Sequence, residues 1–212
     1  MRSNRISAKR NYNIPFFNAE LIKVSINILV AELKTTRLEL RVYKVGDEFS
    51  LFQEYCSDVE ASKYLQRQVH TTVSQTQQML QKWALSYWQQ PSDGFSWVIA
   101  ERKSHLAIGL LTIIQQQNNS LEIHFGLGPR FQGQGYMLEA MKAAIQYFKQ
   151  YLTLKSLDTF CDAEHIQAHQ VLLKTGFEIV ERINAYTLLP KLGNEKRDVL
   201  IFQYRLDHHE EN

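Results

Sequence analysis

The sequence predicts an α/β protein with a mixed, mostly antiparallel sheet flanked by helices. Apolar residues recur with a period of two in segments spread over the chain, which indicates strands. Segments with a helical apolar period lie between them. Strand segments in the middle of the chain are separated only by short turns, whereas later ones are separated by helices. Short turns favour antiparallel neighbours and helical crossovers favour parallel ones, so a mixed sheet is expected.

The first expected strand covers residues 35–42, where alternate residues are apolar. A helix is expected to begin near Asp47, whose carboxylate would cap it. Apolar residues at helical spacing predict a second helix over residues 73–88. The sequence Pro-Ser-Asp-Gly at 91–94 then predicts a turn.

Strands are expected next over residues 95–101, 106–114 and 121–127, joined as an antiparallel meander. A glycine turn leads from the last of them into a helix that is predicted to continue to residue 152. The apolar stripe of this helix consists of Met137, Met141, Ala144, Ile145, Phe148 and Leu152.

The last expected elements are a strand over residues 154–161, a helix over 165–175, and strands over 177–186 and 199–206. Gly176 directly follows the helix, at the position where a residue with positive φ often ends one. The expected order is therefore β-α-α-β-β-β-α-β-α-β-β.

The chain is predicted to consist of one domain with an appendage. Residues 34–207 form the expected domain, and residues 208–212 a polar tail. Residues 1–33 are expected to form a partly disordered N-terminal extension. Alternating apolar residues at 22–30 predict an extra strand there, the alternatives being a short helix packed on the domain or a start site placed too far upstream.

The composition narrows the classes of partner and compartment. A formal net charge of +2 gives no reason to expect nucleic acid or a membrane surface as a partner, and no apolar run is long enough for a membrane span. Cys56 and Cys161 are far apart and lack metal-ligand spacing. Unpaired thiols, a cytoplasmic location and no metal site are therefore expected.

The most informative segment runs from Glu122 to Phe148 and reads as a strand, a glycine turn and an amphipathic helix. The first N–H groups of a helix lack partners within it and the helix dipole adds positive potential, so this end of a helix binds anions. Gly133 and Gly135 lack a Cβ, which allows a sharp turn and a close approach of the backbone to a ligand. The segment therefore predicts a pyrophosphate-binding loop.

Two common phosphate-binding motifs do not fit these residues. No Lys-Ser or Lys-Thr follows the glycines, as a Walker-type loop requires, and Leu138 stands where the dinucleotide fingerprint needs a glycine. The pattern that is present is Arg130-x-x-Gly133-x-Gly135.

This pattern resembles the pyrophosphate loop of the GNAT superfamily of acyl-CoA-dependent N-acetyltransferases. Other segments resemble, in order, the branch that acetylates the N-terminal alanine of ribosomal proteins. They are Thr35-x-Arg37-Leu-x-Leu-Arg41, Leu121-Glu-Ile-His-Phe125, Gly133-Gln-Gly-Tyr-Met-Leu-Glu139-Ala140, Leu172-Leu-Lys-Thr-Gly-Phe177, and Arg197-Asp198 ahead of Tyr204 and Leu206. The resemblance covers residues 34–207 and implies a sheet splayed between its fourth and fifth strands.

The resemblance implies acetyl-CoA as the co-substrate. Backbone N–H groups of the glycine loop would hold the pyrophosphate, and backbone groups of the preceding strand would pair with the pantetheine arm. Arg130 would either add a charge-assisted contact or remain a surface cation, and His165 would replace an Asn that contacts CoA in the family. The implied cofactor-binding residues are Phe125, Gly126, Leu127, Arg130, Gln132, Gly133, Gln134, Gly135, Tyr136 and His165.

The resemblance also implies direct transfer of the acetyl group to an amine, which must be neutral when it attacks. Glu122 matches an acidic position of the family and is the candidate general base, the alternative being a structural carboxylate with local hydrogen bonds. His124 stands where the family usually has Gly and shares the Glu122 side of the strand. It would assist the base, fill space or narrow the substrate slot.

The chain departs from the family at the helix after the fifth strand. The family pattern N-x-x-S is replaced by His165 and Ala168, and the Tyr that serves as general acid in another branch falls at Leu172. No general acid is therefore expected, and backbone dipoles would stabilise the leaving CoA thiolate. Cys161 is expected to be a buried, unreactive thiol rather than a nucleophile.

The leading expectation is an N-acetyltransferase, monomeric or homodimeric, that acts on a protein N-terminal amine or a small-molecule amine. The alternatives are a non-catalytic acyl-CoA-binding module and an interaction domain that kept only the fold. The acceptor is expected to meet residues 55–88 and 184–197. Lys191, Lys196 and Arg197 in the second segment would favour an acidic acceptor or belong to a solvated loop.

Overall fold

The computed structural model describes residues 29–89, 93–116 and 119–206. In this part of the chain an eight-stranded sheet has the strand order β1-β2-β3-β4-β5-β6-β8-β7. Its strands are β1 (Leu33–Lys34), β2 (Leu38–Arg41), β3 (Gly94–Glu101), β4 (Ala107–Gln115), β5 (Ser120–Leu127), β6 (Ser156–Asp162), β7 (Glu178–Leu188) and β8 (Lys196–Arg205). Of the neighbouring strands only β5 and β6 are parallel, which confirms the predicted mixed sheet.

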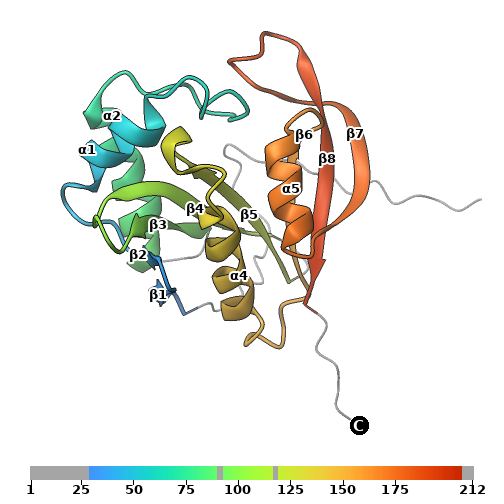
Figure 1. Ribbon diagram of the computed structural model, residues 1–212. Helices are drawn as coiled ribbons and strands as arrows, with labels where there is room; N and C mark the ends of the chain where they lie inside the picture. The colour runs from blue at the N-terminus through green and yellow to red at the C-terminus, as the bar shows by residue number, and fades with distance from the viewer. Residues whose placement is uncertain (1–28, 90–92, 117–118, 207–212) are drawn as a thin grey trace, which may run out of the picture.

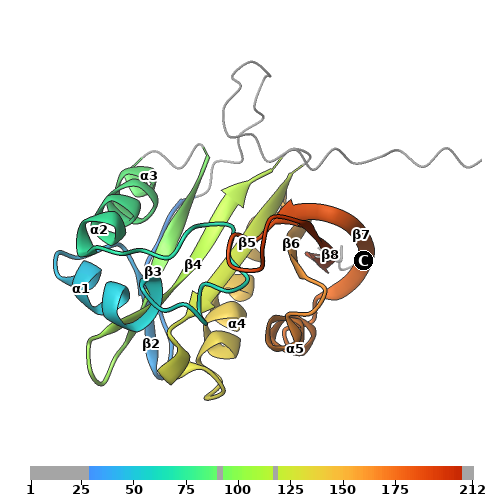
Figure 2. The same cartoon turned by 90° about the horizontal axis from the view of Figure 1, so that it is seen from above.

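Helices cover both faces of the sheet, as Figure 2 shows. Helices α1, α2 and α3 lie on one side of strands β2–β4, and α4 and α5 lie on the opposite side of the sheet. The helical elements are α1 (Asp47–Leu51), the π-helical turn η1 (Phe52–Cys56), α2 (Val73–Gln81), the π-helical turn η2 (Lys82–Ser86), α3 (Tyr87–Gln89), the 3₁₀ turn η3 (Pro129–Phe131), α4 (Tyr136–Phe148) and α5 (Ile166–Lys174).

The apolar periods of the sequence explain the two cores. On the α4 side, the buried stripe of that helix packs against the sheet, where Trp97 and Phe148 lie with ring centroids 5.8 Å apart. On the opposite face a smaller core joins Leu51 and Tyr55 of the first helical segment to Val98 of β3. Successive residues of β3 therefore point into different cores, as the pleat of a strand requires.

The sheet is splayed between β5 and β6. The two strands pair only from Ser120–Glu122 to Ser156–Asp158, and beyond these residues they diverge (Figure 1). The rest of β5 remains paired with β4 through Leu127. This is the splay expected between the fourth and fifth strands, since the additional short β1 shifts the count by one.

Two local predictions were wrong. Asp47 is not a helix cap, because its carboxylate accepts from the Arg41 guanidinium at 2.7 and 2.8 Å and from the Lys44 amide, and Gly46 occupies the cap position. Leu152 does not extend the stripe of α4, because that helix ends at Phe148 and Leu152 is 77% exposed.

Two other predictions fall largely on residues outside the described ranges. Of the expected strand at 22–30 only Leu29 and Val30 are described, and neither is in a strand. Of the expected turn at 91–94 only the last two residues are described, and Gly94 begins β3 with a φ of 135°.

Candidate active site

The glycine loop presents free backbone donors at the start of α4. Gly133 and Gly135 have φ values of 73° and 78°, in the left-handed region that favours glycine. Within the described residues, the N–H groups of Gly133, Gln134 and Gly135 donate no hydrogen bond, and the first amide of α4 to donate is that of Glu139, to the Gly135 carbonyl. The loop is exposed, so these N–H groups are available to an anion.

The other residues of the loop have specific partners. The Gln132 amide donates to the Pro129 carbonyl at 3.2 Å, so this N–H is already used, unlike those that follow it. The Arg130 guanidinium pairs with Glu54 of η1 at 3.1 Å, although 66% of its side chain stays exposed. The Gln134 side chain donates to the Arg130 carbonyl at 2.6 Å and so stabilises the turn.

Arg37, which directly precedes β2, supports the loop. Its Nε lies 2.6 Å from Oε2 of Glu139, in the first turn of α4, and its Nη1 donates to the Gln134 carbonyl at 2.9 Å. Its guanidinium also lies over the Tyr136 ring, 4.3 Å from the centroid. Thr35 donates to the same carboxylate of Glu139 at 2.5 Å. The Thr35-x-Arg37 segment therefore fixes the start of α4, a role that the sequence reasoning missed.

The end of β5 borders the splay on one side. Phe125, Gly126 and Leu127 pair with β4, and beyond Glu122 the strand has no ladder to β6. A Cβ at Gly126 would lie 2.1 Å from the Tyr55 hydroxyl oxygen, so only glycine lets η1 pack this closely against the strand. Burial raises the pKa of Tyr55, which keeps its phenol neutral beside this backbone.

Glu122 and His124 form a hydrogen-bonded pair at the point where the strands separate. His124 Nε2 contacts Glu122 Oε1, and Gln116 Nε2 donates to Glu122 Oε2 at 3.0 Å. The Glu122 side chain is 9% exposed and the His124 side chain 31% exposed. The two-residue spacing on a strand does place both side chains on one face, as the sequence predicts.

Aromatic rings line the opposite side of the splay. The His124 ring meets Phe160 of β6 edge-on at 5.3 Å, and Phe160 meets Tyr186 of β7 at 5.2 Å. His124 is therefore held between Glu122 on its own strand and an aromatic wall on β6.

His165 ends the turn before α5 and packs against a loop from the other half of the sheet. Its ring stacks on Tyr64, with centroids 4.1 Å apart and 17° between the planes. Burial, with His169 nearby, lowers the pKa of His165 to about 4, so the ring is neutral at physiological pH. The Gln66 side chain donates to Thr187 at 2.8 Å, a second contact of the same loop across the splay.

The other two α5 positions at which the chain departs from the family pattern are buried. Ala168 is 7% exposed and Leu172 is 1% exposed, so neither position offers a proton donor to the splay. Burial, with Asp162 adjacent, raises the pKa of the Cys161 thiol to about 12. A thiol that is neutral at physiological pH is a poor nucleophile, which agrees with the expected unreactive role.

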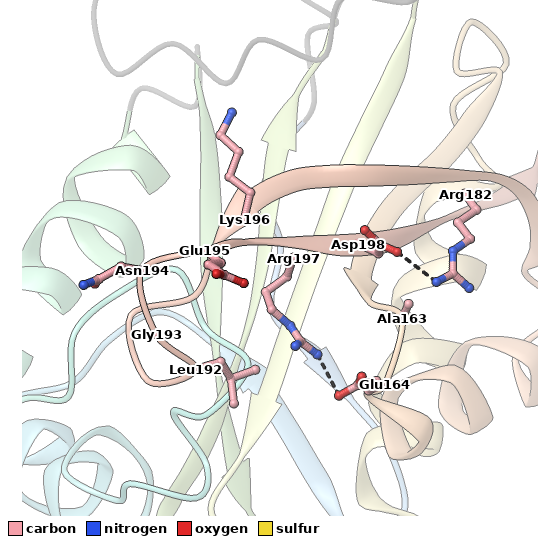
Figure 3. Close-up of a pocket in the computed structure, with 10 residues that line it drawn as sticks. All are labelled: Ala163, Glu164, Arg182, Leu192, Gly193, Asn194, Glu195, Lys196, Arg197 and Asp198. Carbon is pink, nitrogen blue, oxygen red and sulfur yellow. Dashed lines mark hydrogen bonds and ion pairs between the residues drawn. The ribbon is translucent and has the colours of Figure 1, made fainter.

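The loop between β7 and β8 surrounds a hollow of about 600 Å³ (Figure 3). It is lined by residues 192–198 with Ala163, Glu164 and Arg182. None of the predicted catalytic or cofactor-binding residues is among them, but residues 192–197 belong to a segment that is expected to meet the acceptor. Arg197 donates to Asp162 at 2.8 Å and to Glu164 at 2.7 Å, and Asp198 pairs with Arg182.

These ion pairs lower the net positive charge of the Lys191, Lys196 and Arg197 cluster predicted for this loop. Arg197 is neutralised by two carboxylates, while Lys196 is exposed and its side chain extends away from both ion pairs in Figure 3. Lys191 is exposed as well. The arrangement favours a solvated loop over a binding site for an acidic acceptor.

The structure brings the two predicted parts of the site to the same strand–helix unit. The base candidates lie early on β5, the predicted pantetheine strand follows them, and the glycine loop comes next. Sequence reasoning missed Arg37, Glu139, Gln116 and Tyr55, which hold these parts in place. For Arg37 and Glu139 the signal was present, since both stand in the signature segments quoted above.

Two other features are absent from the part of the chain that the structure describes. No group of three or more His, Cys, Asp or Glu side chains is arranged to hold a metal ion among them. No helix in the described ranges is long and apolar enough to cross a membrane.

Comparison with known proteins identifies relatives of the whole domain. The profile of the acetyltransferase (GNAT) domain matches residues 37–178, which is well over half of the chain. An uncharacterized N-acetyltransferase p20 from Bacillus licheniformis is 29% identical over 146 residues, covering 69% of this chain and 82% of that protein.

Solved structures share the fold at low sequence identity. A putative ribosomal-protein-serine acetyltransferase from Vibrio cholerae has a TM-score of 0.68 and 23% identity, over 84% of this chain and 98% of that one. Spermidine N-acetyltransferase from the same organism, solved with CoA and spermine, has a TM-score of 0.66 and 16% identity, over 81% of this chain and 97% of that one.

Proposed function

The chain belongs to the GNAT acetyltransferase family, and on that premise we propose that it transfers the acetyl group of acetyl-CoA directly to a primary amine. The observation that carries the proposal is the row of free N–H groups at Gly133–Gly135, at the end of a strand that begins with a carboxylate–imidazole pair. An anion site and a proton acceptor on one rigid strand–helix unit are what acetyl transfer from CoA to an amine requires.

The donor would bind along β5 and the glycine loop. The free amides of the loop and the N-terminus of α4 fit the pyrophosphate, which can approach because no Cβ covers Gly133 or Gly135. The unpaired edge of Phe125–Leu127 fits the amides of the pantetheine arm, which would add to the sheet like a short strand. This arrangement directs the thioester toward the Glu122 end of the splay.

The chemistry needs the acceptor nitrogen deprotonated and one leaving group stabilised. An amine attacks only when neutral, and an ordinary lysine amine has a pKa of about 10.4, so a proton acceptor is needed near pH 7. The Glu122–His124 pair supplies it. Ala168 and Leu172 of α5 carry no proton donor, so in this proposal the CoA thiolate leaves with the help of backbone dipoles.

The acceptor in this proposal is a primary amine, either at a protein N-terminus or on a small molecule. The relatives described above include a putative ribosomal-protein acetyltransferase and a spermidine acetyltransferase, so the fold serves both classes. The free thiols of Cys56 and Cys161 support a reducing compartment such as the cytoplasm.

Calorimetric titration with acetyl-CoA tests the donor site. Micromolar binding is expected, and it should be followed by a screen of peptide and small-molecule amines with detection of the released thiol. Binding without turnover of any amine would favour the non-catalytic acyl-CoA-binding module. No binding by the folded protein would contradict the proposal and favour the interaction domain.

A further inference from the structure

The two oxygens of Glu122 are both engaged within the protein. Oε1 accepts from His124 Nε2, and Oε2 accepts from Gln116 at 3.0 Å. The side chain is 9% exposed, so an amine that enters the splay meets little of this carboxylate. Its geometry is that of a group that orients a neighbour.

His124 is the member of the pair that faces the opening. Its side chain is 31% exposed, and its Nδ1 makes no hydrogen bond within the described residues. A carboxylate only accepts hydrogen bonds, so the Nε2 that faces Glu122 carries a proton, and in the neutral imidazole Nδ1 then holds the lone pair. In that tautomer the nitrogen without a protein partner is the one that can accept a proton.

The surroundings hold the ring in this orientation. Phe160 of β6 meets the ring edge-on, Thr112 of β4 is its partner in the strand register, and Glu122 fixes Nε2. Among the described groups that contact the ring, Glu122 is the only one that ionises. The arrangement parallels the acid–imidazole pairs of other enzymes, in which a carboxylate sets the tautomer and stabilises the imidazolium.

We propose that His124, through Nδ1, is the general base of the reaction, and that Glu122 is a positioning residue that acts through it. The inference rests on the proposed acetyl transfer. It reverses the roles that the family resemblance implies, in which the carboxylate itself takes the proton.

The proton balance is simple. The acceptor reacts as the neutral amine, after its ammonium form has released a proton to solvent. Nδ1 removes one further proton from the acceptor nitrogen as that nitrogen bonds to the thioester carbonyl carbon, and His124 becomes an imidazolium paired with Glu122. The carbon–sulfur bond then breaks and CoA leaves as a thiolate, which takes up a proton from His124 or from solvent. The products are the amide and the CoA thiol.

Chemical rescue tests the assignment. His124→Gly, which creates room for a free imidazole, should lower kcat by about 100-fold or more while leaving acetyl-CoA affinity unchanged. Added imidazole should restore a large part of the lost rate, after subtraction of the enzyme-free reaction. His124→Gln, which fills the space, is the matched control and should show the same loss without rescue.

Glu122→Gln completes the test. It removes the carboxylate that sets the His124 tautomer and stabilises the imidazolium, so it should lower kcat by about 100-fold or more, and added imidazole should not restore the rate. Near-normal activity of His124→Gly, or a loss that imidazole does not restore in a protein that still melts cooperatively, would overturn the inference, as would near-normal activity of Glu122→Gln. Absence of turnover by the unmodified protein with every amine would instead overturn the proposed function, and the inference with it.

Discussion

Arg37 and Glu139 lie 102 residues apart in the sequence, and their side chains form an ion pair with Nε and Oε2 separated by 2.6 Å. The same guanidinium reaches the Gln134 carbonyl in the glycine loop. One residue directly ahead of β2 therefore fixes both the loop and the first turn of α4, which together form the proposed pyrophosphate site.

Replacing Arg37 by Met should weaken acetyl-CoA binding more than it weakens the fold. The Arg37 side chain is 41% exposed, so its ion pair adds little to global stability, but the contact with the Gln134 carbonyl holds the loop in its binding conformation. We expect a loss of affinity of about three- to tenfold by calorimetry, the value of one net hydrogen bond.

Arg102→Met is the matched control for this prediction. Arg102 also donates to backbone carbonyls of the Thr35–Thr36 segment, at 2.8 and 3.2 Å, but makes no contact with the glycine loop. It should leave acetyl-CoA affinity unchanged. Equal losses of acetyl-CoA affinity in the Arg37→Met and Arg102→Met variants would show that Arg37 acts only by stabilising β2.

Gly135→Val should abolish acetyl-CoA binding. Gly135 has a φ of 78°, which a β-branched residue adopts only with strain, and its new side chain would cover the free amides. Gly193→Val is the control, because Gly193 also has positive φ, at 108°, in an open loop remote from the glycine turn. Calorimetry should show binding only for the second variant. Retained binding by Gly135→Val would place the pyrophosphate elsewhere.

Arg197→Met should destabilise the protein, because it leaves Asp162 without its cation. The Asp162 side chain is fully buried, whereas that of Arg197 is 27% exposed. Loss of one partner of a buried charge pair costs about 3 kcal/mol. Urea denaturation near neutral pH measures the effect, with Lys196→Met as the control, since Lys196 is exposed on the same loop. Equal stability of the two variants would contradict the assigned role of the ion pair.

The sequence predicted the elements because each depends on a local pattern. The alternating strands and the amphipathic α4 follow from residue spacing alone, and the pair Glu122 and His124 follows from the period of a strand. The splay came from the family resemblance, since no spacing rule reveals where two strands separate.

The errors and omissions share a physical cause. Asp47 has the residue type of a helix cap, but Arg41 from the neighbouring strand binds its carboxylate, and such a contact depends on tertiary structure. The support of the glycine loop by Arg37 is equally non-local. The engagement of Glu122 by Gln116 comes from a segment that the sequence presents only as a polar turn.

His165 should make the protein less stable in acid. Its pKa is lowered to about 4 by burial, whereas an unfolded histidine has a pKa of about 6.5. Between these values the unfolded chain binds more protons than the folded one, so the free energy of unfolding rises with pH in this window. The stability linked to neutral His165 is fully present above about pH 6.5 and is lost as the pH falls toward 4. The loss in the free energy of unfolding has an upper limit of about 3 kcal/mol.

His165→Asn, which introduces the residue usual in the family, should flatten this dependence. Urea denaturation at about pH 7.5 and about pH 5 gives the slope for each protein. Some slope should remain in the variant, because the pKa of His70 is also lowered to about 4, by burial and by Arg67. His105→Asn, on the turn between β3 and β4, is the control and should keep the full slope. If His165→Asn also kept the full slope, the His165 imidazole would not be buried against Tyr64. The loop that carries Tyr64 and Gln66 would then not cover this side of the splay.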